Sequence, residues 1–519
     1  MYPNRELELK LSLDPSDTAR LLAHPSVLAA AVGPVEIQAL RTVYFDDREF
    51  SLASRGISLR LRRAGDKQWQ TVKLDGEDPA AGLFSRREIE VESLGERPDL
   101  DAIPDEGVRA QIADALDDRA LEPVFETVMT RRHLVLRDEV AEWCLDLDEG
   151  EIRSGFASEP ICEVELELRA GPVSHLFEFA LGLSDGIVLR PGARSKSERG
   201  HALRTGQRPA AVRARSVVLP PDATLKQAIV PIARSCLAQI GENAEVAYEG
   251  VDPEGIHQMR IGVRRMRALV ALVRQALPSI RLGRLRGPLR SLAALLGEVR
   301  DLDVFLAQSL APHLARRPDD PGLEGLRALA LALCEERRQA LREGLLSPRT
   351  ARLLLELGHW IATTEEQDLE SGDPSVALAR RADHFAEGAL TRLLRKARKR
   401  ASAAIAGSPA DRHALRITLK KLRYSSEFFR SLFDEREAKR FLRRLERLQD
   451  GLGVQNDLAT ERLIAQQILD RTPLEQLPEL ARSAGFLEGW SARAQAKASR
   501  KLAKQWARLE AMQPFWTPD

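Results

Sequence analysis

The chain has 519 residues, which is too long for one ordinary domain and predicts two or three. Its 44% hydrophobic and 30% charged residues are typical of a soluble globular protein, and no apolar run is long enough to span a membrane. The four scattered cysteines lack metal-type or redox-type pairing, which argues against zinc and favours a cytoplasmic location. The net charge of +1 does not exclude a polyanionic ligand, because local stripes of one sign still create strong fields.

The first stretch of interest alternates charged and apolar residues at the spacing of a β-strand. Glu6, Glu8 and Lys10 share one face, and the leucines between them share the other. A single strand of this kind is most often an ordinary surface strand. The same geometry returns, however, in residues 59–62, 87–92 and 162–168. This recurrence predicts a closed sheet with a charged lumen.

The first two hundred residues are dominated by predicted strands. Strands are expected at residues 43–45, 57–63, 69–73, 87–92, 125–136, 141–148 and 161–168, with helices at 99–118 and 176–183. Many short strands separated by turns favour an antiparallel barrel or sandwich. Charges of one sign share a face on several strands, as Arg60 and Arg62 do, and as Asp146 and Asp148 do.

Buried carboxylates are costly unless they are paired or bind a metal ion. A lumen that holds water, Mg²⁺ and phosphate would remove this cost, because Mg²⁺ prefers a few carboxylates together with phosphate oxygens. Arginine gives phosphate two parallel hydrogen bonds, and lysine gives it a point charge. The pattern therefore predicts a site for a phosphate-containing ligand and a hard cation.

These residues carry a family resemblance. The ordered matches are Glu6-x-Glu8-x-Lys10, Tyr44-Phe45-Asp46, Arg60-x-Arg62, Lys73, Arg87-Glu88-x-Glu90, Arg131-Arg132, Asp148 before Gly150, Glu163-x-Glu165 and Ser195-Lys196. With them, residues 1–204 resemble the CYTH family, also called triphosphate tunnel metalloenzymes. The resemblance implies an antiparallel eight-stranded β-barrel tunnel that binds a triphosphate and cleaves it with Mg²⁺ or Mn²⁺.

The resemblance also implies roles for single residues. The implied metal ligands are Glu6, Glu8, Asp148, Glu163 and Glu165. The implied triphosphate ligands are Lys10, Arg60, Arg62, Lys73, Arg87, Arg131, Arg132 and Lys196. Glu6, Glu8, Lys10 and Glu165 are expected to take part in catalysis, and a second metal ion or a carboxylate such as Glu8 or Glu165 would activate the attacking water.

The sequence leaves open which residue of each of two pairs faces the lumen. Adjacent strand residues point to opposite faces, so only one of Arg131 and Arg132 can face the lumen. Asp146 and Asp148 share a face, and Asp148 matches the family pattern better. Glu167 lies beyond the motif, and we expect it to form a structural ion pair. His133, like most isolated histidines, is expected to be structural.

A composition shift at residues 205–221 predicts a linker, because the paired prolines Pro220 and Pro221 break regular structure. From residue 222 to 519 apolar residues recur at helical spacing. This part contains a repeat with an offset of 156 residues. The segment that begins at His257 returns at His413, and the segment that begins at Leu296 returns at Leu452. The repeat predicts two related sets of about four helices.

Each repeat contains one helix with a basic stripe. On a helical wheel the residues that share a sector are His257, Arg260, Arg264 and Arg267 in the first copy, and His413, Arg416, Lys420 and Arg423 in the second. The opposite sectors are apolar. An ordinary solvated helix face usually mixes charge signs, whereas these stripes carry only positive charge and repel internally unless an anion bridges them. The stripes therefore predict anion binding.

With these motif helices, the repeat and the preceding tunnel, residues 222–519 resemble the CHAD domain, an α-helical domain with conserved histidines. The resemblance implies two four-helix bundles related by pseudo-two-fold symmetry, with a basic surface or pore that binds inorganic polyphosphate. The implied contacts are His257, Arg260, Arg264, Arg265, Arg267, His413, Arg416, Lys420, Lys421 and Arg423. The basic run at residues 392–400 extends this charge.

We therefore expect an α+β, two-domain enzyme that hydrolyses inorganic triphosphate and binds inorganic polyphosphate, in the cytoplasm or at polyphosphate granules. Two alternatives stay open. The tunnel could act on another triphosphate, such as thiamine triphosphate or ATP as a cyclase substrate, or the chain could be a weakly active or inactive polyphosphate-binding protein. The intact carboxylates favour an enzyme. Specific nucleic-acid binding is disfavoured, since only 5% of residues are aromatic and none are interleaved with the stripes.

Overall fold

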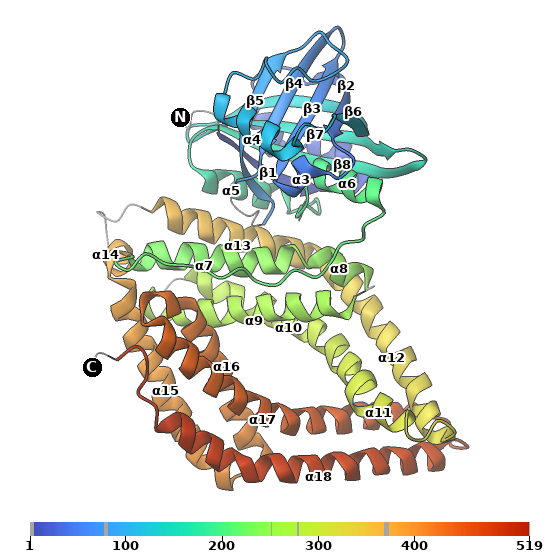
Figure 1. The fold of residues 1–519 in the computed structure, drawn as a ribbon, viewed down its shortest axis with the longest axis vertical. Helices are drawn as coiled ribbons and strands as arrows, with labels where there is room; N and C mark the ends of the chain where they lie inside the picture. Colours follow the sequence, from blue (N-terminus) through green and yellow to red (C-terminus); the bar gives the residue numbers. More distant parts are fainter. Residues whose placement is uncertain (1–4, 77–80, 251, 278–279, 368–372, 518–519) are drawn as a thin grey trace. The chain divides into compact units, whose positions relative to one another are not determined.

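The computed structural model describes residues 5–76, 81–250, 252–277, 280–367 and 373–517. The chain forms two compact units (Figure 1). The first contains residues 1–212, 237–246 and 346–366, and the second contains 213–236, 247–345 and 367–519. Within the described residues, no helix has the length and apolar character needed to cross a bilayer.

Eight antiparallel strands of the first unit close into a barrel (Figure 1). The strands are β1 (Arg5–Ser12), β2 (Glu36–Asp46), β3 (Ile57–Ala64), β4 (Lys67–Leu74), β5 (Leu83–Glu92), β6 (Glu122–Arg137), β7 (Glu142–Ser154) and β8 (Ala157–Ala170). Their order is β5-β4-β3-β2-β6-β7-β8-β1, and β1 pairs again with β5. A two-residue strand, β9 (Arg190–Pro191), pairs with the end of β1. The predicted eight-stranded antiparallel barrel is confirmed.

The alternation in β1 decides which residues line the barrel. Glu8 and Lys10 are buried toward the lumen, and Leu9 and Leu11 are buried toward the outer layer. Lys10 lies opposite Glu165 in the β1–β8 ladder. Because side chains alternate with a period of two, this register places the charged face of each of these two strands inside the barrel.

Helices cover parts of the outer face of the barrel. The short elements are η1 (Pro15–Asp17), α1 (Thr18–Leu22), α2 (Pro25–Ala30) and α3 (Ser51–Ser54), and the longer ones are α4 (Glu106–Leu116) and α5 (Val173–Leu183). The helix expected at residues 99–118 is confined to α4, because Asp105 caps its start by accepting a hydrogen bond from the Val108 amide. Val108 and Ile112 of α4 pack into the cluster that contains Phe45 and Leu59.

Two further helices belong to the first unit. Helix α6 (Lys196–Thr205) starts with a capping box between Ser195 and Glu198 and packs on β6 and β7. Helix α13 (Pro348–Glu366) packs on α5. The Gly358 backbone of α13 approaches Phe177 so closely that an added Cβ would lie 2.3 Å from the Phe177 ring.

The second unit is helical. Its helices are α7 (Leu225–Gly241), α8 (Ala244–Glu249), α9 (Pro253–Ala276), α10 (Ile280–Val304), η2 (Phe305–Leu310), α11 (Ala311–Leu314), α12 (Pro321–Leu346), α14 (Asp373–Ala379), α15 (Ala382–Ala406), α16 (Pro409–Phe429), η3 (Arg430–Leu432), α17 (Glu435–Leu469) and α18 (Leu477–Glu510). Parts of α7 and α8, like the whole of α13, are assigned to the first unit. The residues between α6 and α7 form neither helix nor strand.

The two motif helices, α9 and α16, pack against each other. Helix α10 packs on α9, and both α15 and α17 pack on α16. The apolar sides of the motif helices are fully buried, as Met259 and Val263 in α9 and Leu415 and Leu419 in α16 show. The predicted helical second half is therefore confirmed. Its division into two symmetric four-helix bundles stays a prediction.

Candidate functional site

The barrel encloses a charged cavity of about 780 Å³. Its wall is made of acidic and basic side chains from the strands together with the first residues of α6. The predicted site residues that line it are Glu6, Glu8, Lys10, Arg60, Arg62, Lys73, Arg131, Glu165 and Lys196. The cavity therefore gathers charges of both signs from distant parts of the sequence.

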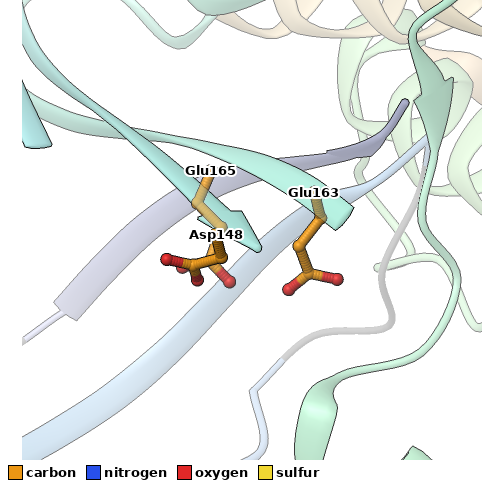
Figure 2. Close-up of side chains that lie close together, drawn as sticks. All are labelled: Asp148, Glu163 and Glu165. Carbon is orange, nitrogen blue, oxygen red and sulfur yellow. The ribbon is translucent and has the colours of Figure 1, made fainter. Parts of the chain in front are cut away.

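Three buried carboxylates meet at one place beside this cavity, which we call the acidic cluster: Asp148, Glu163 and Glu165 (Figure 2). One oxygen of each lies within 4.8 Å of the others. Asp148 comes from β7 and lies opposite Glu163 of β8, while Glu165 is two residues further along β8. The three side chains thus come from one strand pair and one face of it.

Two lysines contact the acidic cluster. Lys196 Nζ lies 2.8 Å from Asp148 Oδ2 and 2.9 Å from Glu165 Oε1, and it also contacts Glu163. Lys10 Nζ lies 3.3 Å from Glu163 Oε1 and contacts Glu165. Burial alone would raise the pKa of Glu165, but Lys10, Lys196 and Arg131 outweigh it and hold this pKa well below its usual range.

The acidic cluster fits a hard cation. Three ionised carboxylates already converge on the ammonium of Lys196, and all three offer the oxygen ligands that Mg²⁺ and Mn²⁺ prefer. Glu6 and Glu8, which the sequence predicts as metal ligands, line the same cavity but are not members of this cluster among the described residues. Lys73 Nζ lies 2.5 Å from Glu6 Oε2, and Glu8 is 3.9 Å from the guanidinium of Arg86.

The structure decides between Arg131 and Arg132. Arg131 lines the cavity and donates to Asp148 Oδ1 at 2.7 Å and to Asp146 Oδ2 at 2.6 Å. Arg132 lies on the other face of β6 and pairs with Glu149. Asp146 and Asp148 are both buried on the inner face, and Asp148 alone of the two belongs to the acidic cluster.

A basic wall made of Arg60 and Arg62 on β3 and Lys73 on β4 also lines the cavity. The Nε atoms of Arg60 and Arg62 are buried and have no hydrogen-bond acceptor among the described residues. Burial and the charges of Arg60 and Arg131 lower the pKa of Arg62. Buried donors without an acceptor are costly, and the oxygens of an anionic ligand would satisfy them.

After Arg132, Arg87 is the second predicted triphosphate ligand that the structure contradicts. It does not line the cavity and pairs with Asp105 on the outside of the barrel. Its neighbour Arg86 lines the cavity instead, on the same face as Glu88. The two-residue spacing from Arg86 to Glu88 and Glu90 is visible in the sequence, so strand parity could have identified Arg86.

Two further cavity residues were expected to be structural. His133 Nδ1 lies 2.6 Å from Asp146 Oδ1, and this hydrogen bond raises the pKa of His133 to about 10. Glu167 forms an ion pair with Arg169 at 3.2 Å, and burial raises the pKa of Glu167 to about 7. Both residues line the cavity and enlarge its set of titrating groups.

The second unit brings the two basic stripes together. We call the residues at the α9–α16 contact the central cluster: Arg260, Arg264, Arg416, Lys420 and Arg423. Arg260 is neutralised in part by Asp301 at 3.0 Å. Arg264 and Lys420 form no hydrogen bond or ion pair with any side chain or backbone group that the structure describes. Burial and the neighbouring arginines lower the pKa of Arg264 to about 10 and that of Lys420 to about 6.

The remaining predicted contacts lie around this cluster. Burial and the charges of Arg300, Arg264 and Arg260 lower the pKa of His257, whereas His413 is exposed. Arg265 is buried, with Nη2 3.2 Å from the Ser235 hydroxyl. Arg267 and Lys421 lie near other cations of α10 and α15. The structure therefore joins half of the ten predicted residues into one cluster.

Comparisons with known proteins match both parts of the chain to domain families. Residues 4–199 match the CYTH domain family, and residues 231–466 match the CHAD domain family. The CHAD domain from the plant Ricinus communis is 33% identical, with a TM-score of 0.51, and the match covers 59% of this chain and 98% of that one. The chain is a CYTH–CHAD protein.

Other relatives resemble the CYTH domain. The inorganic triphosphatase of Haemophilus influenzae is 27% identical over 205 residues, a match that covers 39% of the CYTH–CHAD chain and 56% of that protein. The chain thus spans about half the length of this curated relative. A putative adenylyl cyclase from Hippeastrum, described as having a dominant triphosphatase activity, is 19% identical with a TM-score of 0.27 and covers 39% of the chain and 97% of its own length.

Proposed function

We propose that this protein is a divalent-metal-dependent inorganic triphosphatase whose CYTH domain hydrolyses tripolyphosphate and whose CHAD domain binds inorganic polyphosphate. The observation that carries the proposal is the convergence of three carboxylates, of which Glu165 lines the cavity, beside cavity arginines whose buried donors lack acceptors among the described residues. Inorganic triphosphate is a chain of anionic oxygens with no apolar part, and it matches such a wall better than a ligand with a ring system does. The name of the Haemophilus influenzae relative supports the same substrate.

The cavity residues divide into two roles. Asp148, Glu163 and Glu165 would hold Mg²⁺ or Mn²⁺, which supplies Lewis-acid polarisation of a phosphoryl oxygen when bound. Arg60 and Arg62 bind and orient the phosphates, and their fixed positive charges stabilise the negative charge that develops as the bond breaks. Lys10 and Lys196 keep the carboxylates ionised and add point charges beside the substrate.

The assay is orthophosphate release from tripolyphosphate with Mg²⁺ or Mn²⁺, run beside ATP, thiamine triphosphate and long-chain polyphosphate. Glu163→Gln is expected to abolish release while the protein stays folded. Arg62→Gln is expected to lower kcat/KM by about a hundredfold or more, in the range seen when one charge-stabilising donor is removed. Arg63→Gln is the matched control, because Arg63 is the exposed neighbour on the same strand. Equal activity of the Arg62 and Arg63 variants would contradict the assignment.

Substrate preference separates the alternatives. Faster release from ATP or thiamine triphosphate than from tripolyphosphate would replace the substrate in this proposal. Absence of release from every substrate, together with tight polyphosphate binding, would make the protein a binding protein. The carboxylates of the acidic cluster argue against this second outcome, because a binding site for anions alone has no use for three buried negative charges.

The CHAD half of the proposal is supported by the central cluster. Five cations meet at the α9–α16 contact, and burial together with their mutual repulsion lowers the pKa values of Arg264 and Lys420. A linear polyanion relieves this repulsion over several residues at once. The 156-residue repeat supports the further prediction of two four-helix bundles related by pseudo-two-fold symmetry. Full-length protein is expected to bind long-chain polyphosphate with an affinity that falls steeply with salt.

A further inference from the structure

A second group of cations lies beside the central cluster, on α9 and α16 and on the two helices α10 and α15. We call it the basic extension: Arg267, Arg286, Arg290, Lys396 and Lys421. Arg267 is one helical turn beyond Arg264 on α9, and Lys421 follows Lys420 on α16. The other members come from α10 and α15, the helices that pack on α9 and α16.

No acidic side chain that the structure describes pairs with the basic extension. All five residues are exposed, and none forms an ion pair or hydrogen bond with a group that the structure describes. Lys421 lies near Lys396, Arg267, Arg400 and Arg286, and partial desolvation of its ammonium group together with these charges lowers its pKa. Four helices therefore present cations to one place, where no described acidic side chain offsets their repulsion.

The opposite end of the central cluster differs in charge. Here Arg423 lies 3.5 Å from Glu427 and 3.9 Å from Glu446, and Arg265 is also a neighbour of Glu427. Comparing the two copies of the sequence repeat shows which charges differ between the two ends. Arg265 and Arg423 correspond to Lys421 and Arg267 at the offset of 156 residues, so the basic residues are repeated. The acids are not: Glu427 and Glu446 correspond to Ala271 and Arg290.

From this contrast we infer that a polyphosphate chain bound at the central cluster leaves it in one direction, over the basic extension. The inference rests on the proposed polyphosphate binding and adds a direction and a length preference to it. A short phosphate chain would contact the central cluster alone, whereas a long one would also contact α10 and α15. The ligand is a polyphosphate rather than a nucleic acid, because the aromatic side chains described on α16 are buried and offer bases no stacking surface.

The test compares binding of two probes, tripolyphosphate and linear polyphosphate of about one hundred units, to the full-length protein in chelator, which suppresses hydrolysis. The double variant Arg290→Gln/Lys396→Gln is expected to bind the long probe about tenfold more weakly and the short probe unchanged. Its slope of log Kobs against log salt should fall by about 1.4, since each contact to a single-stranded polyanion contributes about 0.7. The matched control is Arg284→Gln/Arg436→Gln, which removes two exposed cations that lie outside both the basic extension and residues 392–400.

A change at the other end gives the opposite sign. Glu446→Arg places in the second repeat the residue type that the first repeat has at position 290, and it is expected to tighten binding of the long probe several-fold. If the wild type does not bind long polyphosphate, the proposed CHAD function is overturned. If the wild type binds but the Arg290/Lys396 variant matches its control, only the directional inference is overturned. Loss of affinity for both probes to the same extent would also overturn it, because the extension would then be part of one compact site.

Discussion

Replacing Lys196 by methionine tests whether a divalent cation occupies the place where the lysine ammonium lies. Lys196 is 6% exposed and contacts all three carboxylates of the acidic cluster. Methionine keeps a similar volume and removes the charge, so Lys196→Met leaves a buried anionic cluster with less compensation. We expect the variant to be less stable than the wild type in chelator and to regain stability when Mg²⁺ or Mn²⁺ is added.

The size of the effect follows from the remaining contacts. Removing one partner of a buried ion pair costs about 3–5 kcal/mol. Lys10, Arg131 and Arg199 still contact the three carboxylates in the variant, so the lower end, about 3 kcal/mol, is expected. A destabilisation of this size lowers Tm by about 6–12 °C for a domain of about 150–250 residues. A cation at about 100 times its Kd returns about 2.7 kcal/mol.

The assay is thermal unfolding of wild type and variant in chelator and in a titration of Mg²⁺ or Mn²⁺. Metal is expected to raise Tm more in Lys196→Met, because in the wild type the incoming ion has to displace the ammonium from its three carboxylates. Lys67→Met, at an exposed position on β4, controls for loss of a lysine charge. Equal metal-induced shifts in the wild type and in Lys196→Met would refute the reasoning, and so would an unchanged Tm in chelator.

Three further results are expected. Arg264→Glu/Lys420→Glu should weaken polyphosphate binding by at least tenfold, since each charge reversal places an anion where cations converge. The same variant should leave tripolyphosphate hydrolysis unchanged. A parallel loss of binding and hydrolysis would show that the two domains act as one site. Because the pKa of Lys420 is lowered to about 6, polyphosphate binding near pH 7.5 should take up a proton and should weaken as pH rises from 6. The free energy of unfolding should increase with pH above 6, since the unfolded state holds this proton up to its ordinary pKa of 10.5. Calorimetry in buffers of different ionisation enthalpy measures the proton uptake, and persistence of the uptake in Lys420→Gln would contradict the assignment. Gly200→Ala should destabilise the protein by about 1–3 kcal/mol because its Cβ would lie 2.1 Å from the Phe125 ring, whereas Gly182→Ala on α5, with open space around the new Cβ, should be neutral or stabilising in the same thermal unfolding assay.

The sequence alone predicted the barrel because a strand period of two sorts residues by face. Glu8 and Lys10 had to share one side of β1, and Glu163 and Glu165 had to share one side of β8. The same rule separated Arg86 from Arg87, although that separation was not used in the prediction. The basic stripes of α9 and α16 were likewise fixed by the helical period and by the 156-residue repeat.

Period and repeat do not say which face of a strand turns inward or which helices meet. Arg131 and Arg132 are both charged and adjacent, and only the pairing of β6 with β7 places Arg131 against Asp148 in the lumen and Arg132 against Glu149 outside. In the same way, Lys420 looks like any lysine of a basic helix. Its pKa is lowered to about 6 by burial and by neighbouring arginines, among them Arg264, which the packing of α9 on α16 brings beside it. The sequence by itself determined which charged side chains share a face of a strand or a helix. The tertiary structure decided which of these faces are buried together, because electrostatic energy depends on distance and burial rather than on order along the chain.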